Sequence, residues 1–205
     1  MYPLQLVTLY TELTLYVPDP ALIQSTYKKI VAINPNTIFP YWAKIWASAH
    51  AMTLFLHEEP NWIDNKQVLE IGAGIGFPSF SIANKASSVI ISDYNSDAVS
   101  LAQKNINHLN LTNVTATMLD WNHIPSSLFA DTILLSDINY NPDDFNSLVD
   151  SINRFINMGN TIVLSTPNRI TTNPFIDRLS SFVHKTKKYP IDNGETDIAV
   201  FILKK

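Results

Sequence analysis

From Gln67 onward, short apolar runs alternate with longer amphipathic stretches, and no other feature constrains the fold of this chain as strongly. The runs are rich in β-branched residues and are bounded by turn residues, which is typical of strands buried on both faces of a parallel sheet. Strands that alternate with helices predict a doubly wound α/β sheet. The expected strands are 68–71, 89–92, 114–118, 132–136 and 161–165, and the expected helices are 78–85, 96–109, 143–156 and 173–183.

The last segment of the chain is expected to add a hairpin to this sheet. A segment around 184–189 and a strand over 197–203 flank the loop Asp192–Glu195, which has the composition of a turn. We therefore expect a mostly parallel sheet with an antiparallel pair of strands at its edge.

The first sixty residues predict separate elements. Residues 4–17 alternate and are rich in residues that favour strands, which indicates one or two strands. Helices are expected over 21–32 and over 44–57, where apolar positions fall on one helical face. We divide the chain into an N-terminal extension, 1–40, which caps the sheet or shapes the mouth of a site, and a core, 41–205, within a single domain of 205 residues.

The composition limits the class of protein and its partners. Hydrophobic residues make up 46% of the chain and charged residues 16%, as in a globular domain. The net charge of −4 disfavours a protein whose main partner is a nucleic acid. Cysteine is absent, which excludes disulfides and thiolate catalysis. The five histidines form no H-x-x-x-H pair, so we expect no metal site.

The sequence also predicts where the protein resides. Residues 1–5 lack the basic region and following apolar stretch of a signal peptide. No apolar run approaches the roughly 20 residues that a membrane helix needs. We expect a cytoplasmic protein without membrane contact, either a monomer or a weak dimer.

A glycine-rich loop follows the first strand of the alternating region and opens the first helix there. Three of the five glycines of the chain lie in it, at Gly72, Gly74 and Gly76. Glycine permits a tight turn and lets a ligand approach the backbone closely. The amides at the start of the following helix then face the ligand. In this context the loop predicts a cofactor site.

The spacing of the loop distinguishes between cofactors. The dinucleotide fingerprint is G-x-G-x-x-G, whereas Gly76 comes one position earlier than that pattern requires. A P-loop is excluded because no Gly-Lys-Ser/Thr follows. Glu70, just before the loop, would lie close to a pyrophosphate, which is unfavourable. A carboxylate there suits a cofactor with a cationic end, such as S-adenosylmethionine, which has an ammonium and a sulfonium.

Residues after the next two strands complete an adenosine site. Asp93 lies about 21 residues after Gly72, the spacing at which an acid binds ribose hydroxyls. Its alternative role is to cap the next helix, for which Ser96 is better placed. Asp120 can accept a hydrogen bond from an adenine amino group and Trp121 can stack on the ring. The alternative for this pair is a surface turn with a core tryptophan.

Four segments between about Pro40 and Thr166 together resemble the class I S-adenosylmethionine-dependent methyltransferases. More narrowly, they resemble the family-16, lysine-methyltransferase-like group. They are Tyr41–Ala49, which resembles a tryptophan-containing helix near the cofactor; Val68–Pro78, which resembles an E-x-G-A-G-x-G loop; Asp93 with Asn105 and Asn110, which resemble an acid and an asparagine-bearing helix; and Asp137–Tyr140, which resembles a D-x-x-Y motif.

This resemblance implies a Rossmann-like fold with a seven-stranded sheet and an antiparallel last strand. It implies methyl transfer from S-adenosylmethionine to an amine, with a protein lysine as the expected acceptor. The implied catalytic residues are Asp137, which would attract and orient the amine, and Tyr140, which would line the channel. The implied cofactor contacts are Trp46, Glu70, Gly72, Ala73, Gly74, Asp93, Tyr94, Asp120, Trp121 and Ser136.

Other interpretations stay open at this point. A small-molecule amine could be the acceptor. A nucleobase or a glutamine is disfavoured as acceptor, because Ile138–Asn139 lacks the prolines of the (N/D)-P-P-Y motif of those methyltransferases. Asp137 could instead cap the helix that Pro142 opens, where Asp143 competes for that role, and Tyr140 could be an ordinary packed aromatic. The chain could also be an NAD-dependent oxidoreductase, although no hydride-site acid or base is found, or a non-catalytic interaction module that binds the cofactor.

Overall fold

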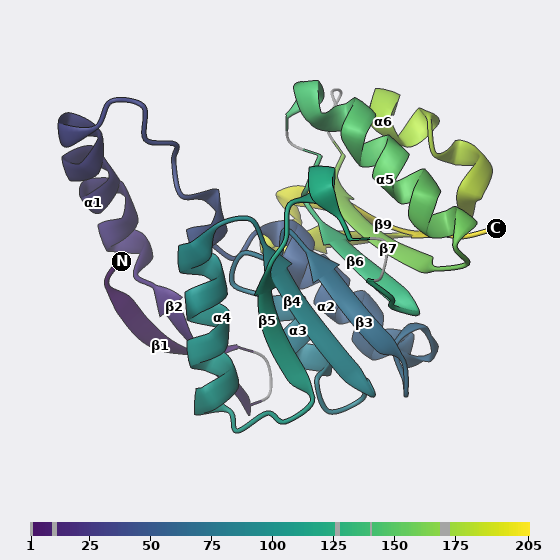
Figure 1. Cartoon of the computed structure of the whole chain (residues 1–205), viewed down its shortest axis with the longest axis horizontal. Helices are drawn as coiled ribbons and strands as arrows, with labels where there is room; N and C mark the ends of the chain where they lie inside the picture. The colour runs from purple at the N-terminus through teal and green to yellow at the C-terminus, as the bar shows by residue number, and fades with distance from the viewer. Residues whose placement is uncertain (1, 10–11, 126–127, 140, 169–172) are drawn as a thin grey trace.

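A seven-stranded sheet with the order β5-β4-β3-β6-β7-β9-β8 forms the centre of the molecule (Figure 1). The computed structural model describes residues 2–9, 12–125, 128–139, 141–168 and 173–205. Neighbouring strands are parallel except at β9, which is antiparallel to both β7 and β8. The predicted sheet with its antiparallel last strand is therefore confirmed. Its strands are β3 (Gln67–Ile71), β4 (Ser88–Asp93), β5 (Val114–Met118), β6 (Thr132–Ser136), β7 (Thr161–Pro167), β8 (Val183–Ile191) and β9 (Thr196–Leu203).

Helices cover both faces of this sheet and enclose two apolar cores. β3 contributes Val68 to one core and Leu69 to the other, because successive side chains of a strand point to opposite faces. Burial on both faces explains why Val68–Ile71 is apolar apart from Glu70, whereas Gln67 at the start of the strand is exposed. Helices α2 (Ala47–Glu58), α3 (Phe77–Ile82) and α4 (Ser96–His108) pack in the first core, and α5 (Phe145–Asn157) and α6 (Asn173–Asp177) in the second.

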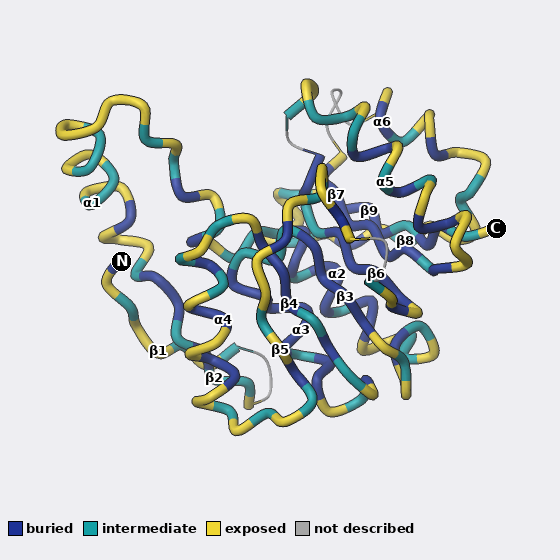
Figure 2. The backbone as a smooth tube through the Cα atoms, viewed as in Figure 1, coloured by how far each residue is buried: buried dark blue, intermediate teal, exposed yellow. Residues whose placement is uncertain are grey.

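The N-terminal extension forms a hairpin beside α4 and then a helix that lies apart from α4 (Figure 1). The antiparallel strands β1 (Leu4–Leu9) and β2 (Leu13–Pro18) confirm the expected strands. Helix α1 (Pro20–Ile33) begins after Asp19, whose carboxylate accepts a hydrogen bond from the backbone N–H of Ala21 at 2.9 Å. Much of α1 is exposed and only Ile23 of this helix is buried (Figure 2).

The side chain of Asn105 connects the hairpin to α4. Its Oδ1 accepts a hydrogen bond from the backbone N–H of Tyr16 at 2.8 Å, and its Nδ2 donates to the carbonyl of the same residue at 3.0 Å. The asparagine is fully buried, and Leu15 and Val17 on either side of Tyr16 belong to the first core. The amide thus pairs with the backbone as a neighbouring strand would, which holds the extension in place.

Three predicted helix boundaries were wrong by three or more residues. The helix expected over 78–85 ends at Ile82. The helix expected over 44–57 begins at Ala47, because Tyr41–Ala43 forms the short 3-10 helix η2 and Trp46 has an extended backbone (φ −90°, ψ 159°). The helix expected over 173–183 ends at Asp177. Ser180–Phe182 of the predicted helix forms the short 3-10 helix η7, and only its last residue, Val183, belongs to β8, where it pairs with Leu203 of β9.

Candidate active site

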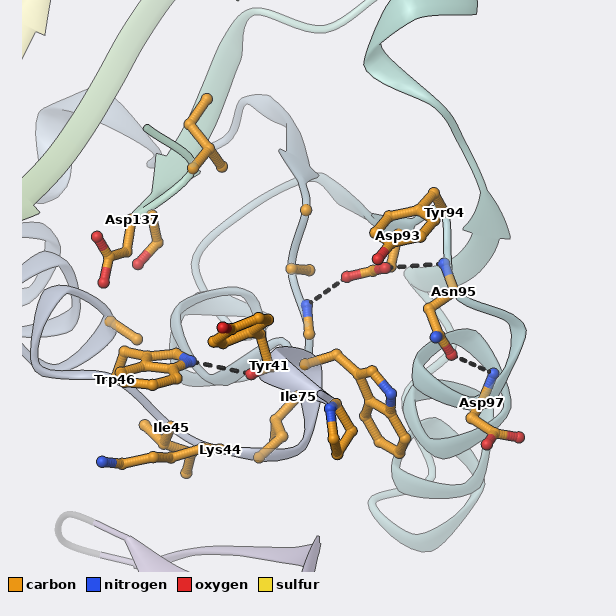
Figure 3. A pocket seen from close by; sticks show the side chains of 18 of the residues that line it. Tyr41, Lys44, Ile45, Trp46, Ile75, Asp93, Tyr94, Asn95, Asp97 and Asp137 are labelled. Atoms are coloured by element: carbon orange, nitrogen blue, oxygen red, sulfur yellow. Dashed lines mark hydrogen bonds between the residues drawn. The ribbon is translucent and has the colours of Figure 1, made fainter. Parts of the chain in front are cut away.

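A cavity of about 530 Å³ opens at the carboxyl ends of β3, β4 and β6. β3 pairs with β4 on one side and with β6 on the other, so the strand order reverses at this point. In doubly wound sheets, the crevice at such a reversal is where ligands bind. Figure 3 shows the glycine loop between Asp93 on one side of the cavity and Asp137 on the other.

The glycine loop requires glycine for its backbone conformation. Gly72, Gly74 and Gly76 have φ values of 66°, 55° and 77°, in the left-handed region that side chains disfavour. A Cβ at Gly74 would lie 2.9 Å from the carbonyl oxygen of Trp42, so the loop also packs closely against the segment before α2. Gly72, Ala73 and Gly74 line the cavity, as predicted for a loop that approaches a ligand.

Glu70 lies beneath the loop and lines the cavity although it is only 1% exposed. Its Oε2 accepts a hydrogen bond from the backbone N–H of Ser79 at 3.2 Å, while its buried Oε1 accepts none from any residue that the structure describes. Burial raises the pKa of this carboxyl to about 7, against the lowering effect of Ser79. A cationic group in the cavity would compensate the buried charge, so Glu70 fits the ammonium of S-adenosylmethionine.

Asp93 links the glycine loop to α4. One carboxylate oxygen accepts a hydrogen bond from the N–H of Gly74 at 2.9 Å and the other from the N–H of Asn95 at 2.9 Å. Burial raises the pKa of Asp93, and the hydrogen bonds from Asn95, Gly74 and Tyr94 oppose that effect. A carboxylate has about four lone-pair sites, so these three donors leave one to accept a hydrogen bond from a ribose hydroxyl, as the predicted binding requires. Tyr94, which was predicted to contact the cofactor, also lines the cavity and is 54% exposed.

The cap of α4 differs from the expected one. The side chain of Asn95 accepts hydrogen bonds from the N–H groups of Asp97 and Ala98, so Asn95 is the N-cap and Ser96 is the first helical residue. The expectation that Ser96 caps this helix was wrong. Because Asn95 fills this role, the carboxylate of Asp93 is left to hold the loop instead.

The structure separates the two members of the Asp120–Trp121 pair. Trp121 lines the cavity, and its ring would lie 3.4 Å from a Cβ placed at Gly72. Asp120 is not among the described lining residues. It caps the short 3-10 helix η4 (Trp121–His123) and accepts hydrogen bonds from Asn122 at 2.9 Å and from His123 at 3.0 Å, which lower its pKa. Its predicted contact with adenine stays a prediction.

At the end of β6, Ser136, Asp137 and Ile138 line the other side of the cavity. Asp137 has a φ of 52°, a left-handed conformation that costs energy for a residue with a side chain. Its backbone N–H donates to the carbonyl of Ser165 at 2.9 Å, which ties this strained residue to β7. Tyr140, the second predicted catalytic residue, lies outside the described residues.

Asp137 does not cap the following helical turn. Asn141 is the N-cap of η5 (Pro142–Asp144), and its side chain accepts a hydrogen bond from the N–H of Asp143 at 3.2 Å. The alternative roles of Asp137 and Asp143 as caps of this turn were therefore wrong. The strained conformation of Asp137 instead points to a requirement of the site.

The N-terminal extension supplies a wall of the cavity that the sequence motifs did not identify residue by residue. Tyr2, Ile30 and the segment Thr37–Pro40 line the cavity, followed by Tyr41, Trp42, Lys44 and Ile45 before the predicted Trp46. This placement supports the expectation that the extension shapes the mouth of the site. The individual residues follow from packing, since they lie in irregular segments without a periodic pattern.

The part of the chain that the structure describes shows neither a metal site nor a membrane-spanning helix. It contains no group of three or more histidine, cysteine, aspartate or glutamate side chains arranged to hold a metal ion. None of the helices there is long and apolar enough to span a membrane.

Sequence comparison identifies the family. Residues 26–185 match the lysine methyltransferase family, family 16 of the methyltransferases. This chain belongs to that family. It is 28% identical to the mouse histone-arginine methyltransferase METTL23 over 118 residues, which cover 55% of this chain and 47% of the relative. It is 25% identical to the protein N-terminal and lysine N-methyltransferase EFM7 of Cryptococcus neoformans over 186 residues, which cover 82% and 59%.

Solved structures share the fold. The N-methyltransferase NodS of Bradyrhizobium japonicum, in complex with S-adenosyl-L-homocysteine, superimposes with a TM-score of 0.65 at 14% identity, covering 89% of this chain and 97% of that chain. The family confirms the predicted cofactor, S-adenosylmethionine. The chain spans about half to three fifths of the length of the two curated relatives it matches.

Proposed function

We propose that this protein transfers a methyl group from S-adenosylmethionine to the side-chain amine of a lysine in another protein. The observation that supports this most directly is Asp137, a carboxylate held in a strained conformation on the cavity wall, across from the glycine loop. Family membership favours a lysine acceptor. A free small-molecule amine is the alternative acceptor.

In this proposal, the two sides of the cavity have separate roles. Glu70 and the loop Gly72–Gly74 hold the amino acid end of the cofactor, Asp93 binds its ribose, and Trp121 packs against its adenine. When bound, the cofactor supplies an electrophilic methyl group on a sulfonium. Asp137, with Ser136 beside it, faces the acceptor amine. Holding the amine in line with the methyl group can lower the barrier by roughly 7–11 kcal/mol.

The acceptor lysine must lose a proton before it attacks, because an ammonium has no lone pair. Asp137 favours the charged amine and so attracts it to the cavity. Removal from water has the opposite effect and lowers the pKa of a lysine from its ordinary value of about 10.4. The apolar residues Ile45, Ala49 and Trp46 line the cavity and would exclude water around the amine. The proton leaves to solvent before the nitrogen–carbon bond forms and the sulfur–carbon bond breaks.

Transfer of a labelled methyl group tests this proposal. The purified protein is incubated with S-adenosylmethionine labelled in the methyl group and an extract of cells of the source organism, and the labelled amino acids are identified after acid hydrolysis. We expect methylated lysine. Label in methylarginine, in methylhistidine or only in small molecules would contradict the lysine assignment.

A variant of Asp137 shows whether a loss of methyl transfer comes from the loss of its carboxylate or from misfolding. We expect Asp137→Asn to lower the transfer rate about 100-fold, while the affinity for S-adenosylhomocysteine stays within about twofold. Asp150→Asn, an exposed acid on α5, is the matched control and should retain full transfer. Tyr140→Phe tests the second predicted catalytic residue in the same assay. Unchanged transfer in both Asp137→Asn and Tyr140→Phe would contradict the proposed acceptor site.

The protein is also proposed to act in the cytoplasm, as a monomer or a weak dimer. The absence of cysteine is compatible with a reducing compartment. Fractionation of cells that express the tagged protein tests the compartment, and sedimentation at several concentrations tests the oligomeric state.

A further inference from the structure

Aromatic side chains form a continuous row along one wall of the cavity. Tyr27 of α1 contacts Phe39 with ring centroids 5.1 Å apart, Phe39 contacts Tyr41 at 5.3 Å, and Tyr41 contacts Trp46 at 6.3 Å. The last three line the cavity. The row therefore runs from the extension to the side of the cavity where Asp137 lies (Figure 3).

Hydrogen bonds to the backbone fix the two ends of this row. The indole N–H of Trp46 donates to the carbonyl of Tyr41 at 2.9 Å, which holds the two residues together (Figure 3). The hydroxyl of Tyr27 donates to the carbonyl of Thr37 at 3.1 Å. Phe39 and Trp46 lie outside the helices and strands, yet these hydrogen bonds and ring contacts hold the row in position before any acceptor binds. A surface arranged in advance loses less entropy on binding.

One face of Trp46 already holds an ammonium group. The Nζ of Lys44 lies 4.6 Å from the centroid of the indole. Such a contact is electrostatically favourable because the ring face is negative. In the view of Figure 3, Lys44 lies on one side of the Trp46 indole and Asp137 on the other, and both Trp46 and Asp137 line the cavity. A cation between the two would contact a ring face and a negative charge together.

We propose that Tyr41 and Trp46 form the acceptor-binding wall, with the lysine side chain of the acceptor lying along it and its ammonium between Trp46 and Asp137. This inference rests on the proposed function and deepens it by naming the groups that select the acceptor. It assigns Trp46 to acceptor binding, whereas the sequence resemblance implied a cofactor contact. Ile38 and Tyr41, which are 71% and 48% exposed, extend the wall outward toward the segment that bears the lysine.

Fluorine NMR on the whole protein tests this wall without requiring the natural acceptor. The protein is labelled with 5-fluorotryptophan, saturated with S-adenosylhomocysteine and titrated with n-butylammonium, which has the length and charge of a lysine side chain. We expect the Trp46 resonance, assigned from Trp46→Phe, to shift with a dissociation constant of roughly millimolar size. Neutral 1-butanol at the same concentrations should leave it unchanged.

Trp62 is the internal control, because its ring also lies near ammonium groups but outside the described cavity lining. Lys66 and Lys204 are 5.8 Å and 5.3 Å from its centroid. Its resonance should not respond to n-butylammonium. A response of Trp62 equal to that of Trp46 would overturn the proposal, since it would show nonspecific contact of the cation with exposed indoles.

Variants of Tyr41 test the wall separately from the cofactor. Tyr41→Ala should weaken n-butylammonium binding roughly fivefold and leave the affinity for S-adenosylhomocysteine unchanged, while Tyr41→Phe should bind both as the wild type does. A Trp46 resonance that does not respond, or responds equally to 1-butanol, would overturn the proposal. Tighter binding of n-butylguanidinium than of n-butylammonium would overturn the choice of lysine.

The two proposals fail in different ways. If labelled methyl groups appear in lysine but Trp46 does not respond to n-butylammonium, the acceptor wall is wrong and the function stands. If Trp46 responds but no lysine is methylated, the cation site stands and the proposed activity is wrong.

Discussion

At the scale of single residues, Gly74 meets two independent restrictions. Its φ of 55° disfavours any side chain, and a Cβ would lie 2.9 Å from the carbonyl oxygen of Trp42. We therefore expect Gly74→Ala to lose at least tenfold in affinity for S-adenosylhomocysteine, measured by calorimetry, because the loop and the cavity wall must both move.

Gly159→Ala separates the two restrictions. Gly159 also has a positive φ, of 90°, but a Cβ there meets no atom within 4 Å. This variant should lose only the roughly 1–2 kcal/mol of backbone strain and keep full cofactor affinity. Equal loss of stability in the two variants, with cofactor affinity retained in both, would show that the contact with Trp42 does not matter.

The buried carboxyl of Glu70 makes cofactor binding depend on pH. With a pKa of about 7, it is mostly neutral at pH 5.5 and half ionised at pH 7. Since only the ionised form compensates a cationic ligand, the affinity for S-adenosylhomocysteine should rise about tenfold between pH 5.5 and 7.0. Calorimetry over this range tests the expectation. The Glu70→Gln variant should bind S-adenosylhomocysteine more weakly and lose most of the pH dependence. An unchanged pH dependence in this variant would show that another group causes it.

Stability without the cofactor should change in the opposite direction. The folded protein keeps a proton on Glu70 between pH 4.5 and about 7, whereas the unfolded chain has lost it. The contribution of this group to the free energy of unfolding is therefore fully present below pH 4.5 and declines as the pH rises to 7. The stability difference between Glu70→Gln and the wild type, measured by urea unfolding, should shift in favour of the variant over this range.

At the scale of elements, the hairpin β1–β2 depends on a side chain of α4. Asn105 is buried and makes two hydrogen bonds to the backbone of Tyr16. We expect Asn105→Ala to cost about 2–4 kcal/mol, because the N–H and carbonyl of Tyr16 lose their partner. The measurement is urea unfolding, together with limited proteolysis, which should cleave the extension earlier than in the wild type.

Asn107→Ala is the matched control for this element. Asn107 is exposed on the same helix, and its side-chain Oδ1 accepts a hydrogen bond from the side chain of Gln103 at 3.0 Å. Its replacement should change the free energy of unfolding by less than about 0.5 kcal/mol. If both variants lose the same amount, the stability of the hairpin does not rest on Asn105.

At the scale of the whole molecule, the cavity joins segments that are far apart in the chain. The extension, the glycine loop, the start of α4 and the end of β6 all contribute to its lining. Saturation with S-adenosylhomocysteine should therefore slow amide hydrogen exchange in 70–76, 93–97 and 136–138 together, and also in 40–46. Mass spectrometry of peptides from the whole protein measures this. The edge strand β8, outside the described lining, should be unaffected, and protection confined to 70–76 would contradict a shared site.

The sequence by itself determined the parts of this protein that depend on local pattern. The alternation of apolar runs and amphipathic stretches predicted the sheet and its helices, because a strand buried on both faces must be apolar throughout. The glycines predicted the loop, since their positive φ values are a local requirement. Glu70, Asp93 and Asp137 could be placed near the cavity because strand ends converge in such a sheet.

Only the tertiary structure decided what depends on contacts between distant segments. It brought Tyr2, Ile30 and Thr37–Pro40 of the extension to the cavity wall beside Tyr41 and Lys44, and it placed the side chain of Asn105 against the backbone of the hairpin. In the folded chain, the carboxylate of Asp120 accepts hydrogen bonds from Asn122 and His123 in the turn that follows it. No periodic pattern in the sequence predicts these contacts, because each depends on which distant segments pack together in the folded chain.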